Sequence, residues 1–376
     1  MIILGSTGSI GVNTLNIARK FNLNIEVLVA GRNIELLNKQ IEEFKPKKVV
    51  IANKEDISKI NHSNVSYGEE SILNAIEDST SSTVVNALVG FLGLRPTLKA
   101  IECNKKIALA NKESLVVAGK FIDQSKLTPI DSEHFGLWYL LQDKKIDSMT
   151  VTASGGSFRD YPLEQLANVS IKEALNHPNW SMGNKITIDS ATMTNKIFEL
   201  MEAAWLFDIR KLDAIIETKS LIHAMINFAD GSTTAHIANA SMQLPIAYAI
   251  LGRVDEQVLK PVDLLKVGSL EFREIQSSRY PIWEAKDEII NNLDLGVVLN
   301  AANEVAVSKF LNSEIGFLDV SKLTLNALNK FNNISVKNID DIYAIDKEVR
   351  LYCESWFTYS FWNTISSCYF SYLLKK

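Results

Sequence analysis

The chain begins with a short apolar run that leads directly into a glycine-rich turn. Residues 2–4 are Ile-Ile-Leu, Gly5-Ser6-Thr7-Gly8-Ser9-Ile10-Gly11 follow at once, and residues 12–20 have the pattern of a helix. Glycines let a backbone turn tightly and approach a pyrophosphate, whose charge meets the free amides at the start of the helix. This order of strand, turn and helix favours a dinucleotide-binding α/β domain at the N-terminus, although the G-x-x-G-x-x-G spacing alone is only moderately specific.

The following segments repeat the alternation of strand and helix. Further apolar runs, separated by stretches that can form helices, lie at 25–30, 49–52, 83–88, 107–110 and 127–130. This alternation is typical of a parallel sheet with helices on both faces. We therefore predict a doubly wound, Rossmann-like domain over residues 1–130, with ligands at the carboxyl ends of its strands.

The end of the second strand bears on the choice of nucleotide. It leads into Gly31-Arg32-Asn33, at the place where an NAD-binding unit usually carries an acidic residue for the ribose hydroxyls. An arginine there suits a 2′-phosphate, so the sequence favours NADPH over NADH. The alternative is an exposed arginine in an ordinary loop.

The overall composition limits the kind of partner. With 376 residues, of which 47% are apolar, we expect two or three domains with cores of their own. A formal net charge of −5 argues against nucleic acid or an anionic membrane as the main partner. The three cysteines have no ligand spacing, and we see no signal peptide and no membrane-spanning run, so we expect a cytoplasmic protein.

Two carboxylates follow the sixth predicted strand. Asp131 and Glu133 are two residues apart, so on an extended segment they share one face, and their repulsion is relieved by a proton, a basic partner or a cation. A solvated turn is the simpler interpretation. Lys112 lies in the turn after the fifth strand and is a further candidate for this edge of the sheet, although a lysine in such a turn is usually on the surface.

The pattern changes after residue 131. Alternating segments at 148–153 and 185–189 enclose a long loop, which predicts an α+β domain over residues 131–252. Ser154 opens a Ser-Gly-Gly turn that could hold an anion. The loop ends in residues 177–183, where Trp180 and Met182 are too apolar to be left in water without a reason. Such a loop either closes over a ligand or packs on a neighbouring sheet.

A helix follows, for which Asp189 or Ser190 is the expected cap. Asn195, Glu199 and Glu202 recur on one face, and a first turn with free amides and Lys196 suits a phosphate. The alternative is an ordinary amphipathic helix with a solvated polar face. The residues that we expect to face the core are Met193, Ile197, Leu200, Met201 and Ala204.

The remaining chain divides into four parts. His223 and His236 lie in two further alternating stretches before residue 252. We predict a connecting segment at 253–280, a small all-helical domain at 281–351 and an aromatic tail of unknown role at 352–376.

Eight motifs resemble one known family. GSTGSIG, AGR, LANKES, PIDSEH, SGGSFR, HPNWSMG, DSATMTNK and LNAANE occur in this order between residue 2 and about residue 350, as in the 1-deoxy-D-xylulose 5-phosphate reductoisomerase family. The resemblance implies a metal-dependent enzyme, a homodimer, that rearranges 1-deoxy-D-xylulose 5-phosphate and reduces it with NADPH. The product is 2-C-methyl-D-erythritol 4-phosphate, an isoprenoid precursor of the non-mevalonate route.

The resemblance also implies roles for individual residues. Asp131, Glu133 and Glu199 would be the ligands of Mg²⁺ or Mn²⁺ and, with Lys112, the catalytic residues. The implied substrate-binding residues are Lys112, Ser132, Glu133, Ser154, His177, Trp180, Ser190, Asn195, Lys196, Glu199 and His223. The implied NADPH-binding residues are Gly5, Ser6, Thr7, Gly8, Ser9, Ile10, Gly31, Arg32, Asn33, Asn111, Glu113 and Gly183. Residues 217–220 are Glu-Thr-Lys-Ser, whereas the family usually has His-Pro-Gln-Ser before the residue equivalent to His223.

Two other functions are compatible with the motifs taken singly. A simple NADP-linked dehydrogenase would need no divalent cation, and a non-catalytic NADP-sensing module would leave Asp131 and Glu199 without a function.

Overall fold

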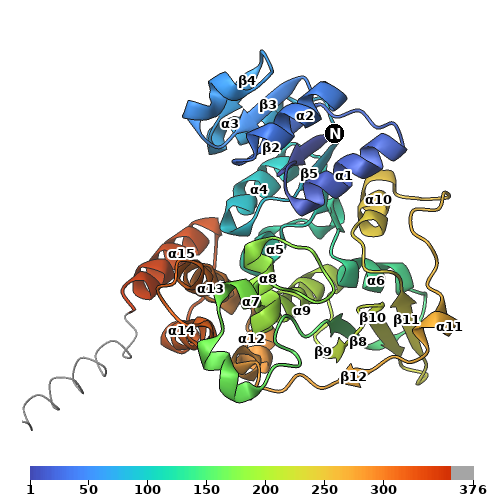
Figure 1. Ribbon diagram of the computed structural model, residues 1–376, viewed down its shortest axis with the longest axis vertical. Helices are drawn as coiled ribbons and strands as arrows, with labels where there is room; N and C mark the ends of the chain where they lie inside the picture. Colours follow the sequence, from blue (N-terminus) through green and yellow to red (C-terminus); the bar gives the residue numbers. More distant parts are fainter. Residues whose placement is uncertain (357–376) are drawn as a thin grey trace, which may run out of the picture.

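The computed structural model describes residues 1–356, and its N-terminal part is a seven-stranded sheet (Figure 1). All neighbouring strands are parallel, in the order β4-β3-β2-β1-β5-β6-β7. The strands are β1 (Ile2–Leu4), β2 (Val27–Ala30), β3 (Lys48–Ile51), β4 (Val65–Tyr67), β5 (Thr83–Asn86), β6 (Lys106–Leu109) and β7 (Leu127–Pro129). The six predicted strands are confirmed, and the Rossmann-like class with them. The missed strand, β4, is a short edge strand without a buried residue, so it carries little apolar signal.

The strand order reverses at β1, which pairs with β2 on one side and β5 on the other. This reversal opens a crevice at the carboxyl ends of β1 and β5, where a parallel sheet binds its ligands. Gly5 turns the chain there with φ +88°, and a Cβ on it would lie 2.6 Å from the Ala87 carbonyl oxygen. The helices around the sheet are α1 (Ser9–Lys20), α2 (Ile34–Phe44), α3 (Glu69–Asp78), α4 (Leu94–Glu102) and α5 (Lys112–Ala118).

A second, five-stranded sheet follows along the chain, in the order β11-β10-β8-β9-β12. Only β8 and β9 are parallel in it. Its strands are β8 (Ile146–Ala153), β9 (Leu212–Glu217), β10 (Ile222–Phe228), β11 (Thr233–Ile237) and β12 (Phe272–Arg273). The helices α6 (Ser132–Leu140) and α9 (Thr194–Phe207) pack on this sheet and on each other. Strand β7 of the first sheet therefore leads directly into α6, a helix that covers the second sheet.

The predicted strand at 185–189 is wrong, because these residues form α8 (Asn184–Thr192). The alternation of Ile186 and Ile188 resembles a strand, but the buried residues Ile188 and Ala191 are three apart, as on a helix. The cap predicted at Asp189 or Ser190 is also wrong. Both lie inside α8, and the chain turns into α9 at Met193, which has φ +72°. The five residues expected in the core of α9 are buried.

The C-terminal helices cover one side of the molecule (Figure 1). They are α12 (Lys286–Asn291), α13 (Gly296–Leu311), α14 (Phe317–Lys330) and α15 (Ile339–Glu354). The helix α13 is buried on most of its surface and contacts α5, α8, α14 and α15. The predicted start of the aromatic tail at residue 352 is wrong, because residues 352–354 belong to α15. The part of that predicted tail from residue 357 onward lies outside the described residues.

The shorter elements connect these layers. They include α7 (Ile171–Ala174), α10 (Gln243–Leu251) and α11 (Leu264–Val267). Helix α10 returns from the second sheet to the first, where Ile246 and Ala247 pack with Ile17 of α1 (Figure 1). The predicted domain boundaries therefore stay predictions, since α10 falls within the second predicted domain but packs on the first. None of the helices within residues 1–356 has the length and apolar character needed to cross a bilayer.

Candidate active site

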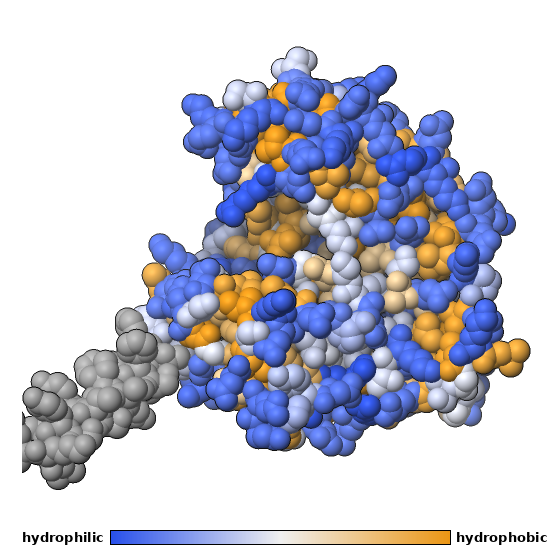
Figure 2. Space-filling model, viewed as in Figure 1, coloured by the Kyte–Doolittle hydropathy of each residue, from blue (hydrophilic) through white to orange (hydrophobic). Residues whose placement is uncertain are grey.

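The surface is hollowed between the N-terminal sheet and the C-terminal helices (Figure 2). Two adjoining cavities lie at the carboxyl ends of the strands. The cofactor chamber is lined by the turn at Gly8–Ile10, by residues 87–89 after β5 and by Glu113. The substrate chamber is lined by the carboxylates, Ser154, Ser190 and Lys196. Lys112, Asp131, Trp180 and Asn195 line both, so the two chambers are continuous.

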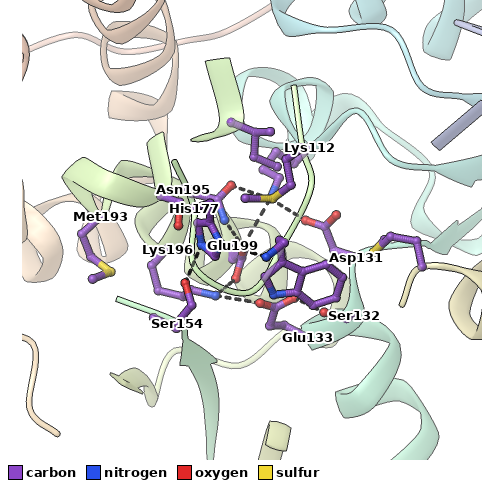
Figure 3. Close-up of a pocket in the computed structure, with 16 residues that line it drawn as sticks. Lys112, Asp131, Ser132, Glu133, Ser154, His177, Met193, Asn195, Lys196 and Glu199 are labelled. Atoms are coloured by element: carbon purple, nitrogen blue, oxygen red, sulfur yellow. Dashed lines mark hydrogen bonds and ion pairs between the residues drawn. The ribbon is translucent and has the colours of Figure 1, made fainter. Parts of the chain in front are cut away.

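Three carboxylates and two ammonium groups alternate at the floor of the substrate chamber (Figure 3). Lys112 Nζ lies 2.5 Å from Asp131 Oδ2 and 3.3 Å from Glu199 Oε1. Lys196 Nζ lies 2.8 Å from Glu133 Oε1 and also pairs with Glu199. Asp131 and Glu133 come from the start of α6, whereas Glu199 comes from the second turn of α9. The packing of α6 against α9 thus brings together the three predicted metal ligands.

Burial and pairing set the charges of these groups. Burial acts to raise the pKa of Glu133, but the ammonium of Lys196 outweighs it and lowers that pKa to about 2. Burial and then the charge of Glu133 raise the pKa of Glu199. The pKa of Lys112 is raised despite its burial, chiefly because Asp131 and Glu199 are adjacent. Two cationic lysines therefore neutralise most of the charge of the carboxylates.

The three predicted metal ligands fit a hard divalent cation, because Asp131, Glu133 and Glu199 offer only carboxylate oxygens. Their side chains already surround positive charge, which Lys112 and Lys196 supply. Within residues 1–356, however, the three side chains whose ligand atoms all lie within 4.8 Å of one another are Asp131, His134 and Glu202. Among these described residues, Asp131, Glu133 and Glu199 do not all lie that close to one another, and Lys196 lies between Glu133 and Glu199.

His134 and Glu202 form a buried pair beneath this floor, which the sequence interpretation left out of the site. His134 Nε2 donates to the Glu199 carbonyl oxygen at 2.8 Å, and Nδ1 lies 3.1 Å from Glu202 Oε2. Burial raises the pKa of Glu202 to about 7, and Glu202 raises the pKa of His134 against the effect of burial. Two features of the sequence could have identified this pair: the adjacency of His134 to Glu133, and the position of Glu202 on the polar stripe of α9.

The predicted phosphate ligands line the same chamber as the carboxylates. Ser154, Ser190, Asn195 and Lys196 all line it, and Ser154 follows the end of β8. Asn195 Oδ1 accepts from Lys112 Nζ at 2.7 Å, and its Nδ2 donates to Glu199. Two of the residues expected around the phosphate, Asn195 and Lys196, therefore bond directly to the carboxylates.

The loop 177–183 borders both chambers. His177 Nδ1 accepts from the amides of Asn179 (3.1 Å) and Trp180 (3.0 Å), so Nε2 carries the proton and donates to Ser154 Oγ at 2.8 Å. Burial, together with Arg159, lowers the pKa of His177 to about 4, so the ring is neutral. Trp180 and Met182 line both cavities, which favours the ligand-closing interpretation of this loop over packing alone.

His223 lies behind the chamber wall. Its Nε2 donates to the Ala238 carbonyl oxygen at 3.0 Å, and its ring meets Trp180 edge-on at 6.2 Å between centroids. Asn179 Nδ2 donates to Ser220 Oγ at 2.7 Å, within the segment that departs from the family pattern. His223 thus contacts the loop from behind, and its predicted contact with substrate stays a prediction.

The predicted cofactor residues fall into three groups. Gly5–Ile10 form the turn at β1, and Glu113 and Gly183 line the cofactor chamber. Gly31, Arg32 and Asn33 are exposed at the end of β2, where Asn33 Oδ1 caps α2 by accepting from the Leu36 amide. Asn111 is buried, and its Nδ2 donates to the carbonyls of Leu88 and Gly90. Asn111 therefore supports the wall of the chamber.

Comparisons with known proteins agree along most of the described chain. Family models described as 1-deoxy-D-xylulose 5-phosphate reductoisomerase match residues 1–119, its C-terminal domain residues 127–207, and DXP reductoisomerase C-terminal domain residues 237–352. The reductoisomerase of Nautilia profundicola is 59% identical over 363 residues, covering 94% of this chain and 99% of the relative. That of Wolinella succinogenes is 52% identical over 353 residues, covering 93% and 98%.

Solved structures give the same result. A crystal structure of DOX-P reductoisomerase with NADPH, fosmidomycin and magnesium has a TM-score of 0.88 at 32% identity, covering 94% of this chain and 97% of that chain. The reductoisomerase of Zymomonas mobilis in complex with NADPH has a TM-score of 0.83 at 32% identity, with the same coverage.

Proposed function

The chain belongs to the 1-deoxy-D-xylulose 5-phosphate reductoisomerase family, and from this premise we propose which of its residues bind metal, substrate and NADPH. The protein is an NADP-dependent oxidoreductase of isoprenoid precursor synthesis. It converts 1-deoxy-D-xylulose 5-phosphate to 2-C-methyl-D-erythritol 4-phosphate with NADPH and a divalent metal ion, which is magnesium in the solved relatives.

One observation carries the assignment of the site. Three carboxylates from two helices surround two lysines on the floor of a chamber that opens into the nucleotide turn. Asp131, Glu133 and Glu199 would hold the metal ion, in place of the ammonium groups that now neutralise them. When bound, the ion supplies Lewis-acid stabilisation of the negative charge on the substrate oxygens. Lys112 lies beside Asp131 and would donate to the same oxygens.

The substrate phosphate is assigned to the hydroxyls of Ser154 and Ser190, the amide of Asn195 and the ammonium of Lys196, which all line the substrate chamber. Release of Lys196 from Glu133 and Glu199 would let it pair with the phosphate when metal and substrate enter together. The loop 177–183 would then close the chamber and exclude water while the rearranged aldehyde accepts its hydride.

NADPH would lie in the cofactor chamber, with its pyrophosphate against the amides of residues 5–10 at the start of α1. Arg32, exposed beside that turn, would pair with the 2′-phosphate. Glu113 and Gly183 also line the cofactor chamber. Glycine at position 5 is required because its φ is positive and the Ala87 carbonyl is close.

We further propose that the enzyme is a cytoplasmic homodimer that acts on a small phosphorylated sugar, with neither nucleic acid nor membrane as a partner. The edge strand β11, with its exposed Ile237 and the exposed Tyr139 beside it, offers apolar surface for a second copy. Sedimentation at micromolar concentration distinguishes a dimer from a monomer.

NADPH oxidation with 1-deoxy-D-xylulose 5-phosphate tests the assignment directly. We expect turnover with Mg²⁺ or Mn²⁺ and none after chelation, because the carboxylates alone cannot stabilise an alkoxide. Turnover that survives chelation would instead identify a simple dehydrogenase. Asp131→Asn should bind NADPH normally and lose turnover, whereas an NADP sensor would be unaffected by this change.

A further inference from the structure

Lys185 joins the closing loop to the cofactor side of the fold. It is the second residue of α8, and Asn184 alone separates it from the loop 177–183. Its Nζ lies 2.9 Å from Glu113 Oε1 on α5 and 2.7 Å from Asp189 Oδ2, one turn further along α8. The side chains of Lys185, Glu113 and Asp189 are 15%, 9% and 2% exposed, so these ion pairs are shielded from water.

The second oxygen of each carboxylate continues the connection. Asp189 Oδ1 accepts from Asn303 Nδ2 of α13 at 2.7 Å. Glu113 Oε2 accepts at 3.1 Å from Asn111 Nδ2, which also donates to the Leu88 carbonyl oxygen at 2.9 Å. Leu88 lines the cofactor chamber, so a continuous set of hydrogen bonds runs from the start of α8 to the chamber wall.

The electrostatics keep this connection intact. Burial opposes the charge of Lys185, but Asp189 and Glu113 outweigh it and raise the pKa of the lysine. Burial also opposes the charge of Glu113, and Lys185 lowers that pKa. Removing Lys185 would leave two carboxylates buried at one point without their cation, and they would separate or take up a proton.

We propose that Lys185 is a positioning residue that couples NADPH binding to closure of the loop 177–183. The inference rests on the proposed placement of NADPH in the cofactor chamber. NADPH would order the wall that includes Glu113, and Lys185 would then hold the start of α8 against that wall. Trp180 and Met182 of the loop also line the substrate chamber, so a fixed loop end raises affinity for substrate. Coupling of this kind is reciprocal, since each ligand must favour the other equally.

The affinity for 2-C-methyl-D-erythritol 4-phosphate measures this coupling. Reduced cofactor and reduced product cannot react, so calorimetry can give the Kd of the product without NADPH and with saturating NADPH. For the wild type we expect NADPH to tighten product binding by about fivefold or more, the lower range of measured couplings. The coupling is the ratio of the product Kd without NADPH to the product Kd with saturating NADPH. In Lys185→Met this ratio should fall to about one, while Lys185→Arg should restore it.

The control is Lys211→Met, which removes a lysine that is 67% exposed and pairs with Asp147 at the surface. We expect this variant to keep the wild-type ratio. If Lys185→Met fails to fold, Lys185→Gln replaces it, because it removes the same charge and keeps a polar side chain at this position. A purely structural role would lower the melting temperature and leave the ratio unchanged.

Two results overturn the inference, namely a wild-type ratio of one, or a Lys185→Met ratio equal to that of the wild type. Failure of the wild type to bind NADPH would overturn the proposed function itself.

Discussion

Lys196 is the side chain whose removal tests the charge balance of the site most directly. Its ammonium donates to Glu133 Oε1 at 2.8 Å, to the Thr152 carbonyl oxygen at 2.6 Å and to Glu199. The substitution Lys196→Met keeps a long apolar stem and removes the charge. Glu133 and Glu199 then face each other without their shared cation.

The magnitude follows from the geometry. Opposite charges 2.8 Å apart attract by about 6 kcal/mol at an effective dielectric constant of about 20, and desolvation cancels part of this. The lowering of the pKa of Glu133 from 4.5 to about 2 corresponds to about 3 kcal/mol. We therefore expect metal-free Lys196→Met to lose about 3–4 kcal/mol at pH 7, within the usual range for breaking a buried pair.

The pH dependence has a definite sign. A carboxylate with a lowered pKa stabilises the fold above its unfolded value of 4.5, and the contribution disappears as the pH falls through that value toward about 2. The wild type and Lys196→Met should therefore differ fully at pH 7 and progressively less below pH 4.5.

Urea unfolding in the presence of a chelator measures this difference. Mg²⁺ should then stabilise Lys196→Met more than the wild type, because the ion no longer competes with the lysine. A free Mg²⁺ concentration of about 100 times its Kd contributes about 2.7 kcal/mol to the free energy of unfolding. Lys266→Met, which removes a lysine 87% exposed, should cost less than about 1 kcal/mol. Equal stability of Lys196→Met and wild type in chelator, or weaker stabilisation of the variant by Mg²⁺, would refute the reasoning.

Three further changes probe the cofactor turn and the loop. Arg32→Asp should weaken NADPH binding by about 10- to 100-fold, the value of a charge-assisted hydrogen bond, and leave NADH binding nearly unchanged; unchanged NADPH affinity would assign the 2′-phosphate to another residue. Gly5→Ala should cost about 1–3 kcal/mol through its positive φ, whereas Gly31→Ala, with no atom within 4 Å of the added Cβ, should leave the melting temperature unchanged. Since the pKa of His177 is lowered to about 4, loop closure should be constant above pH 6.5 and weaken as the pH falls toward 4. Fluorescence of Trp180, taken as the difference from a Trp180→Phe variant, follows this change, and a response that persists in His177→Gln would assign it to another group.

The sequence alone determined six strands of the N-terminal sheet and the chemical types in the site. Each of the six predicted strands is a local apolar run, and the glycine turn is a contiguous motif, so nearest neighbours along the chain carry the information. The five core positions of α9 were predicted for the same reason, because helical periodicity is local.

Local patterns failed where neighbours in space decide the structure. The segment 185–189 alternates like a strand, yet it is helical because α8 packs against α9 and α13. The edge strand β4 is defined by its pairing with β3 and has no buried residue of its own.

Only the tertiary structure decided how the charges of the site are paired. Three sets of contacts join helices that are distant along the chain. They are the lysines that neutralise the carboxylates, the pair of His134 with Glu202, and the contact of Lys185 with Glu113. Lys185 and Glu113, for example, are 72 residues apart. A buried ion pair depends on distance and on exclusion of water, and both arise only when the helices pack. The sequence thus supplied the carboxylates, and folding supplied the partners that set their charge.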